Sequence, residues 1–224
     1  RLIVEPNELA REREYITHSI HSTRAAFALD QIAEADYDIP EQSIPLDLEA
    51  NQSTFKNIRL WDYRPLLRTF GQLQEIRLYY TFYDVDVDRY RLDDDYRQVT
   101  LSGREIDQND LPDTAQTWVN RHLVYTHGSG VVLSPVNEVL EEGLPNLWVR
   151  DIPPRSTHPE LALTRPEIYY GELTDDYVIV KTKVQELDYP SGDSNVYTTF
   201  EGTGGIVLDS FVKRLAYAIR LGSS

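Results

Sequence analysis

Apolar residues recur at helical spacing near both ends of the chain and at alternate positions in between. Leu9, Ile16, Ile20 and Phe27 fall on one stripe of a helix, and that helix is predicted to begin near Asn7, a residue type that caps helix N-termini. A second stripe near the other end has the same spacing and predicts a last helix; its members are Leu208, Phe211, Val212, Leu215 and Ile219.

Two more helices are predicted between these ends. The first is short and covers Leu66 to Leu73, and the second runs from Asp113 to Thr126. Asp113 can cap the second helix, and Gln116 stands three residues later as in a capping box. The apolar stripe of this helix includes His122, which predicts a hydrogen-bonded histidine on the buried face.

The remaining segments with strand character predict a sheet without regular strand–helix alternation. They are Glu75–Tyr83, Arg97–Leu101, Val131–Val136, Leu147–Ile152, Ile168–Glu172, Tyr177–Val184 and Asn195–Phe200. Tyr177–Val184 has the clearest alternation, with valines on one face and lysines on the other. We expect an α+β fold, mostly antiparallel, with three or four helices in a single domain over residues 1–224. Four prolines predict an irregular connector over 151–166.

One acidic segment breaks the alternation. Apolar residues occupy every second position from Ile76 to Phe82, and in the same phase Asp84, Asp86 and Asp88 follow. A bulge that turns Val85 and Val87 inward and leaves the carboxylates in water is the favoured interpretation. The alternative directs the three aspartates inward, where they need cationic partners or a metal. Hard oxygen ligands suit Ca²⁺, although Arg89 stands where an EF-hand loop needs glycine.

Charge and composition exclude several classes. The 224 residues carry a formal charge of −15, which argues against a generic phosphate-binding surface for nucleic acid or anionic lipid. The 41% of hydrophobic residues argues against a disordered acidic chain. Cysteine is absent, so there is no disulfide framework or thiolate chemistry. Methionine is absent too, and we interpret the chain as a soluble piece of something longer. No stretch is long and apolar enough to span a membrane.

Other candidate chemistry has ordinary explanations that we prefer. The Gly202–Gly205 turn can cradle an anion on its N–H groups but lacks the lysine of a P-loop, and no catalytic motif of a hydrolase or zinc enzyme occurs. His18 and His21 are expected to be a solvated pair. Tyrosines that could line a sugar-binding face, with edge-of-core packing as the preferred alternative, are Tyr79, Tyr80, Tyr169, Tyr170 and Tyr189.

Several stretches together resemble the bacterial uncharacterised protein family 0182. They are Asn57–Asp62, Asp84–Tyr90, Trp118–Gly128, Leu133–Asn137, Arg165–Glu172 and Glu201–Gly205. Ser129 departs from the pattern, in which an aromatic residue follows the Thr-His-Gly. The resemblance implies a multi-pass membrane protein of the cell membrane, found in cyanobacteria and actinobacteria, whose soluble region follows several hydrophobic helices. It implies an extracytoplasmic position for this chain and no known activity.

Three hypotheses of function follow. The leading one is a non-catalytic extracytoplasmic interaction or assembly domain, whose partners are its own transmembrane region and other envelope proteins, without nucleic acid. The second is an enzyme or sensor dependent on a divalent cation, which uses Asp84, Asp86 and Asp88 with His122 or His127. The third is a glycan-binding module. No cofactor is predicted, unless the aspartates hold Ca²⁺ or another divalent cation.

Overall fold

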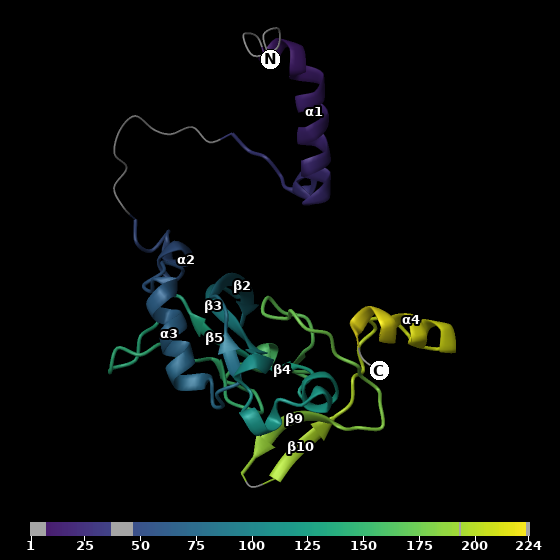
Figure 1. Cartoon of the computed structure of the whole chain (residues 1–224). Helices are drawn as coiled ribbons and strands as arrows, with labels where there is room; N and C mark the ends of the chain where they lie inside the picture. The colour runs from purple at the N-terminus through teal and green to yellow at the C-terminus, as the bar shows by residue number, and fades with distance from the viewer. Residues whose placement is uncertain (1–7, 37–46, 193, 223–224) are drawn as a thin grey trace. The chain divides into compact units, whose positions relative to one another are not determined.

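The long strand β3 (Asp95–Ile106) organises the sheet of the computed structural model (Figure 1). It pairs antiparallel with β2 (Asp86–Leu92), β1 (Tyr80–Phe82) and β5 (Val131–Pro135). The structure describes residues 8–36, 47–192 and 194–222. Because β2 and β5 both pair with Val99–Leu101, this part of β3 is a central strand, whereas the Arg104–Ile106 end pairs with β1.

The other strands extend this sheet or form two small ones. After β5 come β6 (Val149–Arg150) and β7 (Arg155–Ser156), again antiparallel. The small sheets pair β9 (Glu186–Ser191) with β10 (Ser194–Thr198), and β4 (Gly128–Ser129) with β8 (Glu167–Ile168). With the helices, this arrangement confirms the predicted α+β fold with mainly antiparallel strands.

The helices agree with three of the four predicted ones. The α-helices are α1 (Glu8–Ala26), α2 (Gln52–Phe55), α3 (Tyr63–Gln74) and α4 (Phe211–Leu221). Asn7, the predicted cap of α1, lies outside the described residues. The carboxylate of Asp62 caps α3 by accepting the Arg64 N–H at 2.9 Å, and Ser210 caps α4 in the same way. Short 3₁₀ turns are η2 (Leu29–Gln31), η3 (Gln108–Asp110), η4 (Asp113–Ala115) and η6 (Pro159–Leu161).

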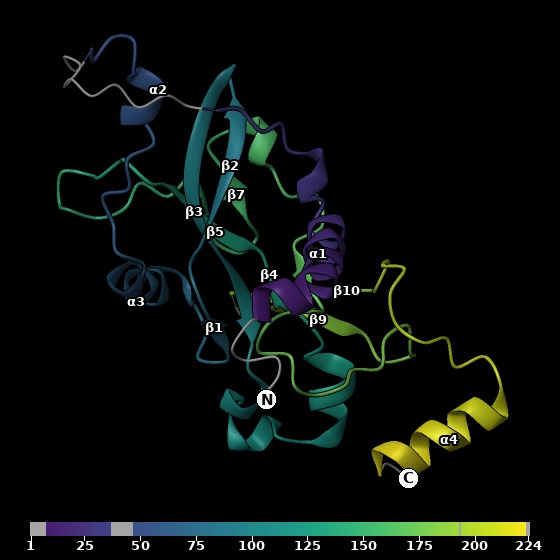
Figure 2. The same ribbon diagram turned by 90° about the horizontal axis from the view of Figure 1, so that it is seen from above.

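Apolar side chains cover both faces of the sheet. Val132 of β5 packs with Leu66 and Phe70 of α3, which lies beside the sheet (Figure 2). The next residue along β5, Leu133, points to the opposite face and packs with Trp148. Because successive residues of a strand face opposite sides, a sheet buried on both faces produces the uninterrupted apolar run at this strand.

The predicted helix over 113–126 is wrong for most of its length. It consists of the 3₁₀ turn η4, a break, and the π-helix η5 (Asn120–Val124). Polar side chains form hydrogen bonds with backbone groups here. Thr117 Oγ1 accepts the Asn120 N–H at 3.2 Å, and Asn120 Nδ2 donates to the Ala115 carbonyl at 3.0 Å. Such local side-chain bonds compete with the helical ladder and interrupt it.

The strand prediction over 177–184 is also wrong. This segment pairs with no strand, Lys181 has a positive φ of 56°, and the Ile179 N–H donates to the carbonyl of His122 at 2.8 Å. The alternating valines therefore do not form a ladder, because the segment is tied to η5 instead. The predicted strand over 75–83 shrinks to β1, since Ile76 has a positive φ of 67°. The strands that were not predicted are β2, β4, β7 and β9.

By its internal contacts the chain divides into two compact units, Arg1–Asp47 and Leu48–Ser224. The expectation of a single domain stays a prediction. Within the described ranges, no helix has both the length and the apolar character needed to cross a membrane. The connector expected over 151–166 is mostly irregular, apart from β7 and η6.

Candidate functional site

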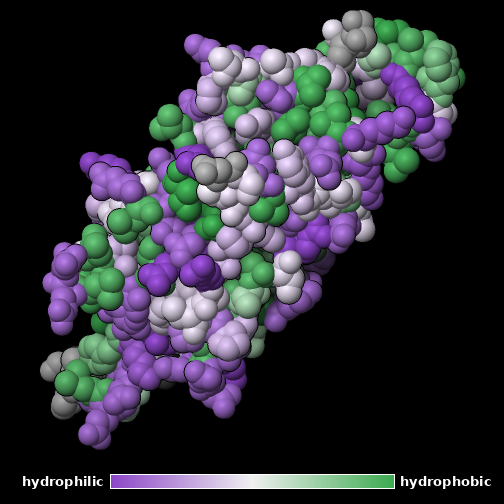
Figure 3. All heavy atoms as spheres, turned by 90° about the horizontal axis from the view of Figure 1, so that it is seen from below, coloured by the Kyte–Doolittle hydropathy of each residue, from purple (hydrophilic) through white to green (hydrophobic). Residues whose placement is uncertain are grey.

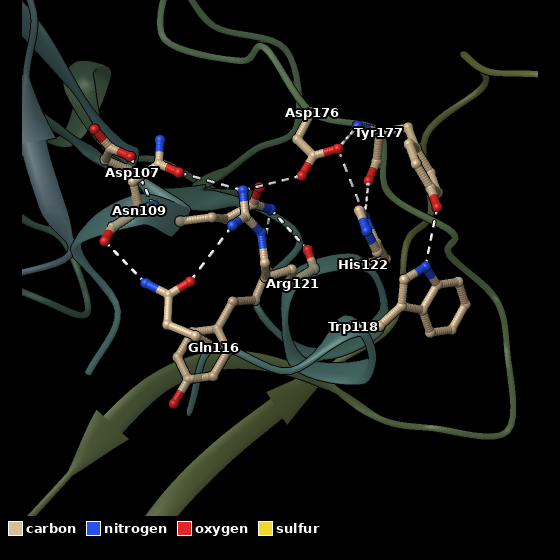
Figure 4. Close-up of polar contacts among 10 residues, drawn as sticks. Asp107, Asn109, Gln116, Trp118, Arg121, His122, Asp176 and Tyr177 are labelled. Atoms are coloured by element: carbon tan, nitrogen blue, oxygen red, sulfur yellow. Dashed lines mark hydrogen bonds and ion pairs between the residues drawn. The ribbon is translucent and has the colours of Figure 1, made fainter. Parts of the chain in front are cut away.

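A polar cluster surrounds the π-helix η5, a type of helix that occurs frequently at functional sites. Arg121 and His122 of η5 point toward Asp176 and Tyr177, which lie on the irregular segment after β8 (Figure 4). Arg121 Nη2 donates to Asp176 Oδ2 at 3.3 Å. His122 Nδ1 lies 2.7 Å from the Tyr177 carbonyl.

The contacts of His122 define its tautomer. A carbonyl oxygen only accepts, so Nδ1 carries the proton and donates it, which leaves the lone pair of the neutral ring on Nε2. The ring stacks on Tyr177 with centroids 4.0 Å and planes 6° apart, and Trp118 packs against it at 5.2 Å. With 7% of its surface exposed, His122 is the buried, hydrogen-bonded histidine that the sequence predicts.

Arg121 connects the segment around Asp176 to the turns before η5. Its guanidinium also donates to Asn109 Oδ1 at 3.3 Å and to Gln116 Oε1 at 3.4 Å. In addition, the Gln108 side chain donates to the Arg121 carbonyl at 2.8 Å. Each of these contacts joins one part of the chain to another, so the cluster holds the segment that carries Asp176 against η5 and the turns before it.

A second polar centre is buried around Glu186 of β9, of which 2% is exposed. Glu186 Oε2 accepts the hydroxyls of Thr126 and Tyr169 at 2.9 and 2.7 Å, and Oε1 accepts the Phe200 N–H at 3.1 Å. Burial, and next the hydrogen bond to Glu186, raise the pKa of the Tyr169 hydroxyl. Glu186 is not among the predicted site residues, because it lies in a strand that was not predicted.

Three polar atoms beside this centre have no hydrogen-bond partner among the described residues. They are His127 Nε2, Ser129 Oγ and Asp188 Oδ1. His127 is 1% exposed and its ring packs against Tyr169 at 4.9 Å. Burial raises the pKa of Asp188, while the positive charge of a protonated His127 would lower it. His127 and Ser129 are buried, with 1% and 0% of their surface exposed, so neither is open to a substrate in this conformation.

The three aspartates of the acidic segment are exposed, and Val85 between them is buried. The favoured interpretation, in which the valines turn inward and the carboxylates stay in water, is therefore confirmed for Val85 and for the carboxylates. It is wrong for Val87, which is 40% exposed because β2 is paired on one side only. Asp84 and Asp88 each accept the N–H of the following residue, at 2.7 and 2.8 Å.

Across the described part of the chain, no three His, Asp or Glu side chains converge in a way that could hold a metal ion. Asp84, Asp86 and Asp88 thus have no preformed ligand cage, and the cation site stays a prediction. Tyr79 and Tyr80 are 9% and 2% exposed and belong to the core. This agrees with the preferred prediction that these tyrosines pack at the core and do not line a sugar-binding face.

A shallow pocket lies where the Gly202–Gly205 turn meets aromatic rings. Glu167, Tyr169, Tyr170 and Phe200 line it together with this turn. A Cβ atom on Gly202 would lie 2.5 Å from the Phe200 ring, and one on Gly204 would lie 2.9 Å from the Tyr170 hydroxyl. This close packing explains the glycines at 202 and 204, and the interpretation of the segment as a tight turn stays a prediction.

Comparison with known proteins identifies the family. The model of an uncharacterised protein family, UPF0182, matches residues 1–224. The chain belongs to this family. Among its relatives, a UPF0182 protein of Pelotomaculum thermopropionicum is 51% identical over 223 residues, which cover 99% of this chain and 24% of that protein. A UPF0182 protein of Methanospirillum hungatei is 51% identical over 222 residues, or 99% of this chain and 25% of its own length.

A UPF0182 protein of Trichodesmium erythraeum is 49% identical over 223 residues, which cover all of this chain and 24% of that protein. The chain thus spans about a quarter of the length of the curated UPF0182 relatives it matches, as expected for a domain of a larger protein. Because these relatives come from different kinds of organism, the cyanobacterial or actinobacterial origin stays a prediction. No solved structure matches the chain.

Proposed function

We propose that this chain is a non-catalytic assembly domain of a multi-pass protein of the cell membrane, on the extracytoplasmic side. In this proposal the domain binds its own transmembrane region and other envelope proteins. The observation that carries the proposal is an apolar face of α4 that the described chain leaves uncovered.

The exposed face of α4 consists of large apolar side chains. Phe211, Val212 and Ile219 are 77%, 75% and 74% exposed, and Leu215 lies between them. Apolar side chains crowd the surface over α4, at the upper right of Figure 3. Contiguous apolar surface of this kind marks interaction sites in soluble domains, because its exposure to water is unfavourable.

The length of the relatives supports a partner within the same protein. Since this chain corresponds to about a quarter of each relative, the other three quarters offer ample polypeptide to cover α4. The resemblance to multi-pass membrane proteins supplies the membrane part of the proposal. An odd number of spans from a cytoplasmic start would place the domain outside the cytoplasm.

The polar sites favour a structural role over catalysis. Arg121 and His122 form hydrogen bonds with Asp176 and Tyr177. The three hydrogen bonds to Glu186 come from Thr126, Tyr169 and Phe200 of the same chain. These groups hold irregular segments of the chain in one conformation, which is a structural role.

Cysteine labelling in the full-length protein tests the proposal, because this chain has no cysteine of its own. One variant, Val212→Cys, reports on the α4 face, and Glu142→Cys, in an exposed loop, is the matched control. We expect a membrane-impermeant maleimide to label the control in spheroplasts before lysis. We expect Val212→Cys to react readily in the isolated chain and to be protected in the full-length protein.

Two results would contradict this proposal. Labelling of Glu142→Cys only after lysis would place the domain inside the cytoplasm. Equal reactivity of Val212→Cys in the isolated chain and in the full-length protein would show that nothing covers α4.

A further inference from the structure

We infer that α4 lies on an anionic lipid surface, with its apolar side chains in the membrane interface and its cationic side chains at the lipid headgroups. This inference rests on the proposed function and narrows it, because it assigns the α4 face to the lipid around the transmembrane region in place of a protein segment.

The apolar side chains of α4 share one side. At about 100° per residue, Phe211, Leu215, Ile219 and Val212 fall within an arc of about 100°. All four are exposed, from 49% for Leu215 to 77% for Phe211. Ile206 and Val207, which are 64% and 74% exposed just before the helix, add to the apolar surface.

The charged residues of α4 are all cationic. Lys213, Arg214 and Arg220 are its ionisable side chains apart from Tyr217, in a chain with 22 Lys and Arg against 37 Asp and Glu. Around the helix, Arg220 and Lys213 follow the apolar arc by about 80–100° and Arg214 precedes it by about 60°. The cations therefore lie on the polar side of the helix, beyond both edges of the apolar arc, as they do in helices that lie in a membrane interface.

The present partners of these cations are weak and local. Lys213 Nζ pairs with Asp209 Oδ1 at 2.8 Å, with both side chains about half exposed, and Arg214 Nε donates to the Leu208 carbonyl at 2.9 Å. An exposed pair of this kind contributes little, so phosphate groups can replace Asp209.

The length of α4 favours a position on the membrane surface. Eleven residues rise about 16 Å, roughly half of the hydrocarbon thickness of a bilayer. A second copy of this chain is a poorer partner, because its own α4 would bring a second set of cations to the contact, whereas anionic headgroups offer the opposite charge.

Vesicle flotation of the 224-residue chain tests the inference. We expect the chain to float with vesicles that contain roughly one third phosphatidylglycerol, and to bind vesicles of phosphatidylcholine alone at least tenfold more weakly. A triple variant, Lys213→Gln, Arg214→Gln and Arg220→Gln, is expected to lose at least tenfold in affinity for the anionic vesicles. A second variant, Phe211→Ser, Val212→Ser and Ile219→Ser, is expected to lose binding.

The matched control is Arg59→Gln, Arg91→Gln and Lys183→Gln, which removes three charges at exposed positions elsewhere and should bind as the unchanged chain does. Circular dichroism and thermal melting check that every variant folds, as expected for changes on an uncovered face.

Equal binding to both kinds of vesicle, or full binding by the serine variant, would overturn the lipid inference. So would a dimer in sedimentation experiments that the serine variant abolishes, because the partner would then be a second copy. If Val212→Cys is protected in the full-length protein while the chain ignores anionic vesicles, the assembly function stands and the lipid inference fails.

Discussion

The Tyr169 hydroxyl donates a hydrogen bond of 2.7 Å to the carboxylate of Glu186, whose surface is 98% removed from solvent. This bond joins the segment after β8 to β9. Two more donors, the Thr126 hydroxyl and the Phe200 N–H, complete the shell of the same carboxylate. A buried carboxylate that accepts hydrogen bonds from three separate segments organises the chain around it.

Glu186→Ala should therefore destabilise the protein strongly. The change leaves donors of Thr126, Tyr169 and Phe200 buried without their acceptor, and each such group costs about 1–3 kcal/mol. We expect a loss of about 3 kcal/mol or more in the free energy of unfolding, measured by urea denaturation. Glu142→Ala, on an exposed loop, is the control and should stay within about 0.5 kcal/mol. A loss as small as that of the control would contradict the structural role.

Asp188 predicts a pH-dependent effect. Burial raises the pKa of this carboxyl above its unfolded value of 3.8, so the folded protein holds the proton more tightly. The stability that this group contributes is complete below the unfolded pKa and is lost as the pH rises through the folded pKa. Asp188→Asn cannot ionise and should therefore gain stability relative to the unchanged chain as the pH rises from about 4 to 7.

Urea unfolding of both chains across this pH range measures the effect of Asp188→Asn. His127, Glu167 and Arg165 also act on Asp188, so His127→Gln is measured beside it to separate the charge of the imidazole. A stability difference between Asp188→Asn and the unchanged chain that is constant from pH 4 to 7 would show that Asp188 ionises alike in both states.

The elements that the sequence predicted correctly depend on local signals. The helices α3 and α4 and the apolar run of β5 are readable because the spacing of neighbouring apolar residues decides them. The burial of His122 was predicted from its spacing alone, although the helix that this spacing assumed is interrupted. Segment 177–184 alternates as a strand does, yet a hydrogen bond to the carbonyl of His122 decides its conformation.

Arg104 shows why the other buried polar residues could not be predicted from the sequence. It is fully buried in β3, where its guanidinium donates to the carbonyls of Gln74 and Ser129, each at 2.7 Å. Burial lowers its pKa to about 10, and an arginine between polar neighbours carries no local sign of such a position. The buried centre at Glu186 was missed for the same reason, since its donors come from segments far apart in the sequence.

Gly128 lies where β4 crosses the backbone of β3. A Cβ atom at this position would be 2.2 Å from the Arg104 carbonyl oxygen and 2.8 Å from the Glu105 Cα. These are backbone atoms of β3 that are held by its pairing with β1, so they cannot move aside easily. Gly128→Ala is expected to cost at least about 2 kcal/mol in urea unfolding.

Gly143→Ala is the matched control for Gly128→Ala. Gly143 has a positive φ of 76° and open space around it, so alanine there should cost only about 1 kcal/mol for the left-handed backbone. Equal losses in the two variants would show that the approach of β4 to β3 is not as close as described.

The acidic segment gives the last prediction. Asp84, Asp86 and Asp88 are exposed, and two of them already accept a backbone N–H, so their oxygens do not converge as the ligands of Ca²⁺ do. We expect millimolar Ca²⁺, Mg²⁺, Mn²⁺ or Zn²⁺ to leave the melting temperature unchanged. A cation at one hundred times its Kd would add about 2.7 kcal/mol of stability, a shift that melting experiments resolve easily. A rise in melting temperature that disappears in Asp84→Asn, Asp86→Asn and Asp88→Asn combined would establish the cation site and revive the sensor or enzyme hypothesis.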